Sequence, residues 1–360
     1  MNTKQYIQII PSPYNPEWNM IRLFSPDMKS GVCEIQLHGA HLTSYKRTCC
    51  ASPISSSSSS TLSSEQSENH HDDELMFVSE KAVFATDKAI RGGTPICFPQ
   101  FSDKGRLSMS HGFARNVKWE HVENVDSSNM YGYDSSATVA CLRMIKSSSY
   151  EGTNKEIAQY LAEYDVLNVE MIFALSNDSL EMTLRVAEDT NALVEDEKFA
   201  KVKSFTFAFH NYFRVDDITH VTLDGIHNNH HGVQYIDKVK KGELITVENS
   251  SPFEITQEVD RVYLDMLNPI ESVIVENKPT NISRMISISQ NASTAQNVVV
   301  WNIWKEKCQK MSDMKTDDFS KYVCVEVGQI QTPVELERGK VFTSSQKIAV
   351  KHVSQNSSKL

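Results

Sequence analysis

The sequence predicts an all-β protein: a single, mostly antiparallel domain built from two large packed sheets. Segments that alternate in polarity, or that are rich in β-branched and aromatic residues, recur along most of the chain. Only residues 155–163 have the pattern of a helix. Apolar residues make up 40% of the 360 residues and are spread along the chain, which allows one large core.

The expected strands follow one another from residue 31 to residue 328. They are residues 31–47, 75–84, 137–145, 166–176, 179–189, 203–215, 220–224, 262–266, 271–277, 285–290, 297–304 and 322–328. Asn177 and Asp178 lie between two of these segments and are typical of a hairpin turn. Each further strand extends the same antiparallel pattern, so residues 1–360 are expected to form one domain.

Two zones interrupt this pattern. A low-complexity loop is expected at about 48–74, where six consecutive serines occupy residues 55–60. His70, His71, Asp72 and Asp73 lie at its end, and we interpret them as solvated residues rather than metal ligands. A second, loop-rich zone at about 126–155 surrounds the strand 137–145. Neither zone offers enough apolar residues to form a core of its own.

Composition excludes several classes of protein. The net charge of −10 disfavours a large nucleic-acid footprint, and the only basic cluster, KVKK at 238–241, is interpreted as a solvated strand end or turn. No run of 18 apolar residues predicts a membrane helix, and no signal segment is visible, so we expect a cytoplasmic protein. Seven cysteines without a CxxC motif indicate reduced thiols and no metal site. Cys33, Cys97, Cys141 and Cys324 are expected to be buried.

Two motifs point to anion recognition. RGGTPICFPQF at 91–101 and SHGFARN at 110–116 place Arg91, Arg115 and His111 close together in the sequence. An arginine can hold two oxygens at once, and glycines beside it let a ligand approach the backbone. Any one of these arginines could instead form an ordinary surface ion pair. The two together favour a small ligand that carries phosphate or carboxylate.

Three acidic or basic residues, His210, Glu326 and Asp260, fall on or beside expected strands. His210 follows the strand of FAFHNYF, where Phe207, Phe209, Tyr212 and Phe213 would give it an apolar pocket that tunes its proton exchange. It could equally be a core histidine with one hydrogen bond.

Glu326 lies in the apolar strand YVCVEVG, where a charge is costly unless it is paired or functional. Strict alternation would place it on the solvent face instead, unless that face lines a cleft. Asp260 could bind sugar hydroxyls, or form a turn or local ion pair with Arg261.

These motifs together resemble a known family. IRGGTPICFPQF, HGFARNVKWE, HNYFRVDD, DRVY, VVVWNIW and YVCVEVG occur in the order and spacing of the glucose-6-phosphate 1-epimerases, or hexose-6-phosphate mutarotases, of the aldose 1-epimerase superfamily. The resemblance extends from about residue 31 to residue 350. It implies a galactose-mutarotase-like β-supersandwich that interconverts the α and β anomers of a hexose 6-phosphate without cofactor or metal. We expect the protein to be a monomer.

The resemblance also assigns roles to residues. It implies that His210 is the general acid and Glu326 the general base of ring opening. It further implies that Arg91, Arg115, Asp260, His111 and Ser110 bind the substrate. At three positions the chain departs from the family: Ser110 stands where glutamine is frequent, Thr94 where an aliphatic residue is usual, and Ile303 where proline is usual.

Two alternatives remain open at this point. An aldose 1-epimerase of unphosphorylated hexoses would use the same acid and base, although the arginine pair argues against it. A sugar-phosphate binding protein without activity would have no need of both His210 and Glu326. A glycosidase is disfavoured, because such enzymes generally use two carboxylates.

Overall fold

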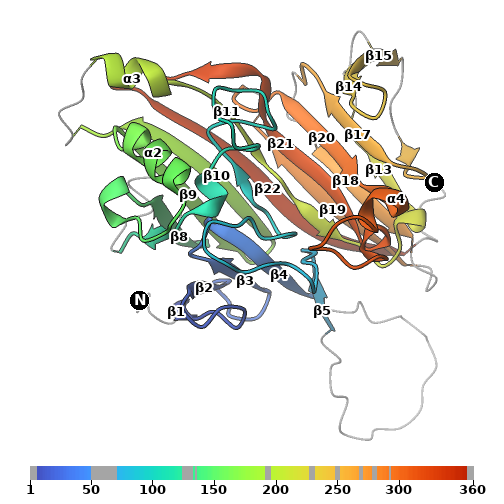
Figure 1. Ribbon diagram of the computed structural model, residues 1–360. Helices are drawn as coiled ribbons and strands as arrows, with labels where there is room; N and C mark the ends of the chain where they lie inside the picture. Colours follow the sequence, from blue (N-terminus) through green and yellow to red (C-terminus); the bar gives the residue numbers. More distant parts are fainter. Residues whose placement is uncertain are drawn as a thin grey trace, which may run out of the picture.

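The computed structural model of the protein describes most of the chain (Figure 1). The described residues are 6–49, 71–123, 133, 136–190, 196–226, 232–247, 252–266, 271–277, 282–291 and 293–354. The serine tract and residues 126–132 lie outside these ranges, so the loops expected there stay predictions. All strand pairs of the described sheets are antiparallel, as the sequence predicted.

A five-stranded sheet forms the N-terminal part of the described chain. Its strands are β1 (Ile7–Pro11), β2 (Asn19–Phe24), β3 (Gly31–Gln36), β4 (His41–Cys49) and β5 (His71–Glu74). The sequence missed β1 and β2, which are short and lie next to prolines and polar residues. The expected strand 31–47 is two strands, because Gly39 and Ala40 both adopt positive φ and turn the chain.

Strand β5 corrects the interpretation of the polar tract. Asp73 was expected to be solvated, but its Oδ2 forms an ion pair with Nε of the buried Arg284 at 2.9 Å. Arg284 lies on another sheet and also contacts Glu276 at 3.4 Å. Asp73 therefore ties the end of the tract to the body of the protein.

The largest sheet has nine strands in the order β16-β13-β18-β19-β22-β10-β9-β8-β7. They are β7 (Trp119–His121), β8 (Ala137–Met144), β9 (Leu167–Ser176), β10 (Ser179–Glu188), β13 (Val221–Asp224), β16 (Phe253–Glu254), β18 (Glu271–Asn277), β19 (Ile282–Gln290) and β22 (Val341–Ser354). The hairpin turn at Asn177 and Asp178 is confirmed between β9 and β10.

The third sheet has eight strands and carries the candidate site. Its order is β15-β14-β17-β20-β21-β11-β6, and β12 also pairs with β21. Its strands are β6 (Ile96–Cys97), β11 (Ser204–Phe209), β12 (Tyr212–Arg214), β14 (Val233–Asp237), β15 (Glu243–Val247), β17 (Val259–Tyr263), β20 (Asn297–Asn302) and β21 (Tyr322–Glu335). The KVKK cluster forms the turn between β14 and β15, as expected.

The nine- and eight-stranded sheets pack against each other, which confirms the predicted pair of large sheets (Figure 1). The rings of Phe205 and Phe207 on β11 contact Phe342 on β22, at centroid distances of 5.4 and 5.6 Å. The expected strand 75–84 is wrong. Only Met76 and Val78 make isolated bridges there. Leu75, Met76 and Phe77 pack as a buried connection, whereas Val83 is 47% exposed.

Helices are few among the described residues. They are α2 (Lys155–Tyr164), α3 (Asp196–Val202) and α4 (Trp304–Cys308), with 3-10 turns η2 (Ala114–Asn116), η3 (Ser147–Ser149), η4 (Ile218–His220) and η5 (Asp318–Ser320). The expected helix is confirmed as α2, whereas α3 and α4 were too short to show a period. Within these ranges, no helix has the length and apolar character that crossing a membrane requires.

The start of α2 allows a test of local structure. Asn154 caps the helix, because its side-chain oxygen accepts hydrogen bonds from the backbone N–H groups of Glu156 and Ile157. We expect Asn154→Ala to lower the free energy of unfolding by about 1 kcal/mol. Asn154→Asp keeps the acceptor and should restore stability in urea unfolding. Equal losses in both variants would contradict a capping role.

Candidate active site

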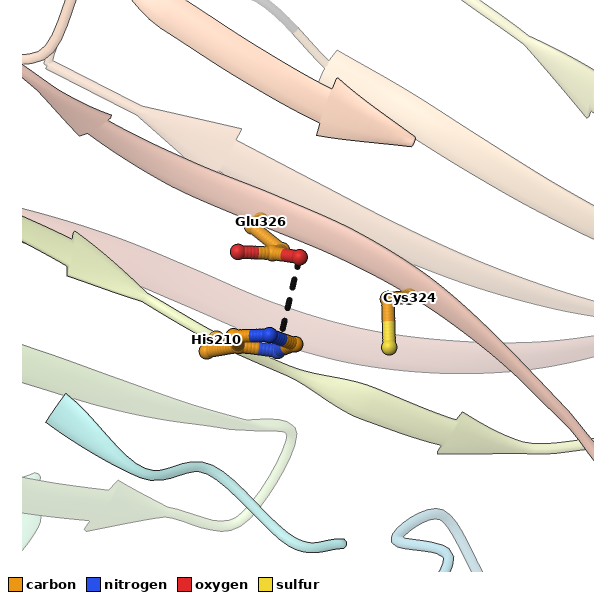
Figure 2. A group of neighbouring side chains, drawn as sticks. All are labelled: His210, Cys324 and Glu326. Carbon is orange, nitrogen blue, oxygen red and sulfur yellow. Dashed lines mark ion pairs between the residues drawn. The ribbon is translucent and has the colours of Figure 1, made fainter. Parts of the chain in front are cut away.

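A break between β11 and β12 places His210 directly across from Glu326. Phe209 pairs with Val327 and Tyr212 with Cys324, so the same register sets position 210 opposite position 326. The ladder is interrupted at this point, and the backbone N–H of His210 donates instead to the carbonyl of Pro95 at 3.0 Å. Figure 2 shows the imidazole and the carboxylate facing each other from neighbouring strands.

Asn211 holds this break in position through hydrogen bonds to β21 and β22. Its amide donates to the carbonyl of Val325 at 2.9 Å and exchanges two 2.8 Å hydrogen bonds with the amide of Gln346 on β22. The hydroxyl of Thr94 donates to Asn211 Oδ1 at 3.0 Å. The family departure at Thr94 therefore adds a hydrogen bond to a buried network that supports His210.

The two faces of β21 resolve the question of where Glu326 points. Val323, Val325 and Val327 lie in the core between the large sheets, as strict alternation requires. The opposite face, which carries Cys324 and Glu326, is not exposed to solvent either: Glu326 is only 2% exposed. The alternative of a solvent-facing glutamate is therefore excluded, because this face of the sheet is also buried at Cys324 and Glu326.

The predicted surroundings of His210 need a similar correction. Phe207, Phe209 and Phe213 point into the core between the sheets, away from the imidazole. The ring that stacks on His210 is Tyr212, at 4.9 Å and 7°, and Trp301 meets it edge-on at 5.9 Å. Tyr212 is therefore confirmed as part of the apolar pocket, whereas Trp301 takes the place that the sequence had assigned to the three phenylalanines.

The His210 and Glu326 side chains form a buried pair. Nδ1 of His210 lies 3.4 Å from Oε1 of Glu326, and both Nδ1 of His210 and Oε2 of Glu326 have no hydrogen-bond partner. Burial lowers the pKa of His210 well below 6.5, and His111, Arg115 and Arg91 lower it further. Burial raises the pKa of Glu326 well above 4.5, which Lys238 and Arg115 oppose and Asp260 reinforces. The pair can therefore share one proton near neutral pH.

The raised pKa of Glu326 predicts a pH-dependent cost to stability. As pH rises through 4.5, the unfolded chain releases the Glu326 proton while the folded protein keeps it, so stability falls up to the folded-state pKa. Each unit of that difference costs about 1.4 kcal/mol. We expect Glu326→Gln to increase the free energy of unfolding more at pH 8 than at pH 4.

Urea unfolding at the two pH values measures this effect. The exposed Glu337 provides a matched control, and Glu337→Gln should give the same small change at both pH values. A stability gain for Glu326→Gln that does not vary with pH would contradict the raised pKa.

The two predicted arginines lie in different settings. Arg115, in η2, donates from Nη2 to the carbonyl of Ser110 at 3.0 Å, while its buried Nε has no partner. Arg91 is already held by Asp313, 3.0 Å from its Nε, and by the hydroxyl of Tyr212 at 3.1 Å. Arg115 is thus the more available of the two donors, and Ser110 contributes its backbone carbonyl to Arg115.

The glycines beside Arg91 have a structural reason different from the one expected. A Cβ on Gly92 would lie 2.3 Å from the carbonyl oxygen of Phe77, and one on Gly93 would lie 2.2 Å from that of Leu42. Both residues also have positive φ. They allow the chain to pack against neighbouring backbone, so ligand access is not needed to explain them.

His111 contacts His210 and has a defined tautomer. Nδ1 of His111 accepts a hydrogen bond from the N–H of Ser102 at 3.2 Å, which leaves the ring proton on Nε2. The ring meets His210 at 5.5 Å and Phe101 at 4.9 Å. Burial, with the charges of Arg115, Lys238 and Arg91, lowers the pKa of His111 to about 2. His111 is therefore a neutral hydrogen-bond donor beside the pair.

Asp260 and Lys238 complete the group on the other side. Asp260 lies across from Trp301, which in turn lies across from Cys324. Its ion-pair partner is Lys238, 3.8 Å away, and not Arg261, which points over the rings of Tyr235 and Phe253. Sequence reasoning missed Lys238 and Trp301. The KVKK cluster was the only signal for Lys238.

One cavity lies apart from this group. It has a volume of about 270 Å³ and is lined by residues that include Trp18, His38, Asn116 and Tyr150. None of the predicted site residues lines it. The buried face of the eight-stranded sheet, rather than this cavity, therefore carries the pair of His210 and Glu326.

Comparison with known proteins is consistent with this arrangement. The sequence model of the aldose 1-epimerase family matches residues 26–349. The chain belongs to the aldose 1-epimerase family. The predicted isomerase class is thereby confirmed.

Individual relatives of this epimerase family member are moderately similar. A protein of Cenchrus ciliaris, provisionally named a glucose-6-phosphate 1-epimerase, is 30% identical over 334 residues, which cover 93% of this chain and 84% of the relative. An Escherichia coli protein with the same provisional name is 25% identical over 339 residues, which cover 93% and 91% of the two chains.

Solved structures confirm the mutarotase-like fold of the epimerase. A Salmonella typhimurium protein provisionally named a mutarotase superposes with a TM-score of 0.65 at 24% identity, covering 97% of this chain and 98% of the other. A galactose 1-epimerase of Lactobacillus acidophilus superposes with a TM-score of 0.57 at 10% identity, covering 96% and 98%. At these identities the likeness concerns the fold alone.

Proposed function

We propose that this epimerase interconverts the α and β anomers of a hexose 6-phosphate, with glucose 6-phosphate as the expected substrate. The observation that carries the proposal is the buried pair of His210 and Glu326, with Nδ1 and Oε1 3.4 Å apart, next to the unpartnered Nε of Arg115. The provisional names of the relatives from Cenchrus ciliaris and Escherichia coli point to the same substrate.

The proposed reaction needs only two proton transfers in each direction. Glu326 takes the proton of the anomeric hydroxyl while His210 donates a proton to the ring oxygen, and the bond between the anomeric carbon and the ring oxygen breaks. The sugar becomes an open-chain aldehyde. The aldehyde group then rotates about the bond that joins it to the next carbon. Reclosure on the opposite face returns the proton from Glu326 and regenerates the protonated His210, which yields the other anomer.

The surrounding charges support a role for the substrate in setting this protonation state. In the free protein Arg91 and Arg115 lower the pKa of His210. A phosphate ester bound to these arginines would offset their charge, so the shared proton would move toward His210 when substrate binds. In the proposal, Arg115 and Arg91 bind the phosphate. His111, Asp260 and Ser110 contact the sugar or position the residues that contact it.

Magnetisation-exchange NMR tests the proposal directly. With the protein present, we expect the exchange rate between the anomers of glucose 6-phosphate to rise far more than that between the anomers of galactose. Faster exchange of galactose alone would favour an epimerase of unphosphorylated sugars. Binding of glucose 6-phosphate without faster exchange would favour a binding protein. A monomeric state and a cytoplasmic location stay predictions.

A further inference from the structure

Cys324 lies beside the proposed acid and base and has no part in the reaction described above. Its sulfur, one nitrogen of His210 and one carboxylate oxygen of Glu326 all lie within 4.8 Å of one another (Figure 2). All three residues are buried, at 0%, 7% and 2% exposure respectively. A nitrogen, a sulfur and an oxygen donor thus converge on one point of the sheet face.

Strand geometry brings these donors together. Cys324 and Glu326 are two residues apart on β21, so their side chains project from the same face. His210 stands across from Glu326, and Cys324 stands across from both Tyr212 and Trp301. Cys324 and Glu326 therefore rest on a paired strand of the eight-stranded sheet, and His210 lies in the short break between two strands that pair with it.

The donor set matches the preferences of one class of metal ion. Zn²⁺ binds imidazole, thiolate and carboxylate at about 2.0 to 2.3 Å in a tetrahedron, which separates its ligand atoms by about 3.3 to 3.7 Å. The 3.4 Å between His210 Nδ1 and Glu326 Oε1 already meets this spacing. His210 Nδ1 is buried without a hydrogen-bond partner, so a metal bound to it would satisfy a polar atom that is otherwise orphaned.

We propose that His210, Cys324 and Glu326 form an inhibitory site for Zn²⁺ or a similar thiophilic divalent cation. The metal occupies the proton-transfer pair, so a bound ion and a reacting sugar exclude each other. The inhibition rests on the proposed function, whereas the binding of the metal does not. Three protein ligands leave a fourth position for water.

Charge and proton balance decide which ions can bind. Burial keeps the thiol of Cys324 protonated, because it raises its pKa well above 9.0. Metal binding releases that proton and any proton on Glu326 or His210, and the thiolate and carboxylate then neutralise the two charges of the ion. Arg115 and Lys238 nearby consequently face a neutral centre. Mg²⁺ and Ca²⁺ prefer oxygen ligands and should not bind.

Cobalt binding to the whole protein tests the site without using activity. Co²⁺ with a thiolate ligand gives a near-ultraviolet charge-transfer absorption. We expect this absorption in the unsubstituted protein and its loss in Cys324→Ala. Cys97→Ala is the matched control, because Cys97 is equally buried on the same sheet but contacts His111 instead. Failure to observe the absorption in the unsubstituted protein, or its persistence in Cys324→Ala, would overturn the site.

Zinc titration of anomer exchange tests the inhibition. We expect Zn²⁺, but not Mg²⁺, to inhibit the exchange of glucose 6-phosphate, and Cys324→Ala to raise the inhibitory concentration by about 10-fold or more. Cys97→Ala should leave it unchanged. If Cys324→Ala does not fold, Cys324→Ser and displacement of bound Co²⁺ by glucose 6-phosphate provide the same comparison. Equal zinc sensitivity with and without the thiol, or no displacement by the sugar phosphate, would refute the proposal.

Discussion

His210→Ala and Glu326→Gln should each slow the protein-catalysed anomer exchange of glucose 6-phosphate by about 100- to 10,000-fold. Each variant removes one of the two proposed proton-transfer groups, whose nearest side-chain atoms lie 3.4 Å apart. Magnetisation-exchange NMR at saturating substrate measures the effect. Full activity in either variant would refute the assignment of acid and base.

The double variant makes the test sharper. If the two groups act as one pair that shares a proton, the loss in His210→Ala with Glu326→Gln should be much smaller than the product of the single losses. Circular dichroism and urea unfolding provide the folding control. Independent, multiplicative losses would indicate that the residues serve different steps, which would contradict a concerted opening of the ring.

A pH profile follows from the same pair. The pair takes up a second proton with a pKa well below 6.5, the ordinary value of histidine, because burial and the cations around His210 oppose a positive charge on the imidazole. Removing the last proton occurs well above 4.5, because burial opposes the Glu326 carboxylate. These two steps bound the pH range of the active, singly protonated pair, so their apparent pKa values belong to the pair and not to either residue.

Periodicity and a composition rich in β-branched and aromatic residues predicted several strands of the largest sheet. β8, β9, β10 and β19 were found with boundaries close to those expected. β22 was missed although it lies in the middle of the largest sheet. Its Ser344 and Gln346 are 1% exposed, because Gln346 pairs with Asn211 across the core. A polar residue satisfied by a partner 135 positions away interrupts the apolar pattern, and the sequence alone does not identify the partner.

The candidate site shows the same limit of local patterns. Motifs led to His210, Glu326 and Arg115, since each lies in a short segment of distinctive composition. Lys238 and Trp301 were not found, because only the pairing of β14 with β17, and of β17 with β20, brings them next to Asp260. Strict alternation would place Glu326 on the solvent face, because this rule assumes that one face of a strand is exposed to solvent. Here both faces of β21 are buried from residue 322 to residue 330.

Arg115→Ala should lower kcat/KM for glucose 6-phosphate by about 10- to 100-fold, the expected effect of losing a charged hydrogen bond worth about 1.5 to 3 kcal/mol. Its Nε is buried without a partner, so an anion is the group that would satisfy it. The same substitution should change the reaction of free glucose much less, because that sugar carries no phosphate. Comparing the two sugars by NMR in the same variant separates phosphate binding from structural damage.

Three further variants complete the test of Arg115. The first shows whether its guanidinium binds phosphate through two planar donors or only through its charge. Arg115→Lys keeps the charge but not the planar donors, so it should recover only part of the loss. Arg91→Ala should have a smaller effect than Arg115→Ala, because Asp313 already holds the Arg91 guanidinium. Arg22→Ala, which removes a surface pair with Glu34, is the matched control and should leave both sugars unaffected. Equal losses for glucose and glucose 6-phosphate in Arg115→Ala would show that the arginine supports the fold of the site rather than the phosphate.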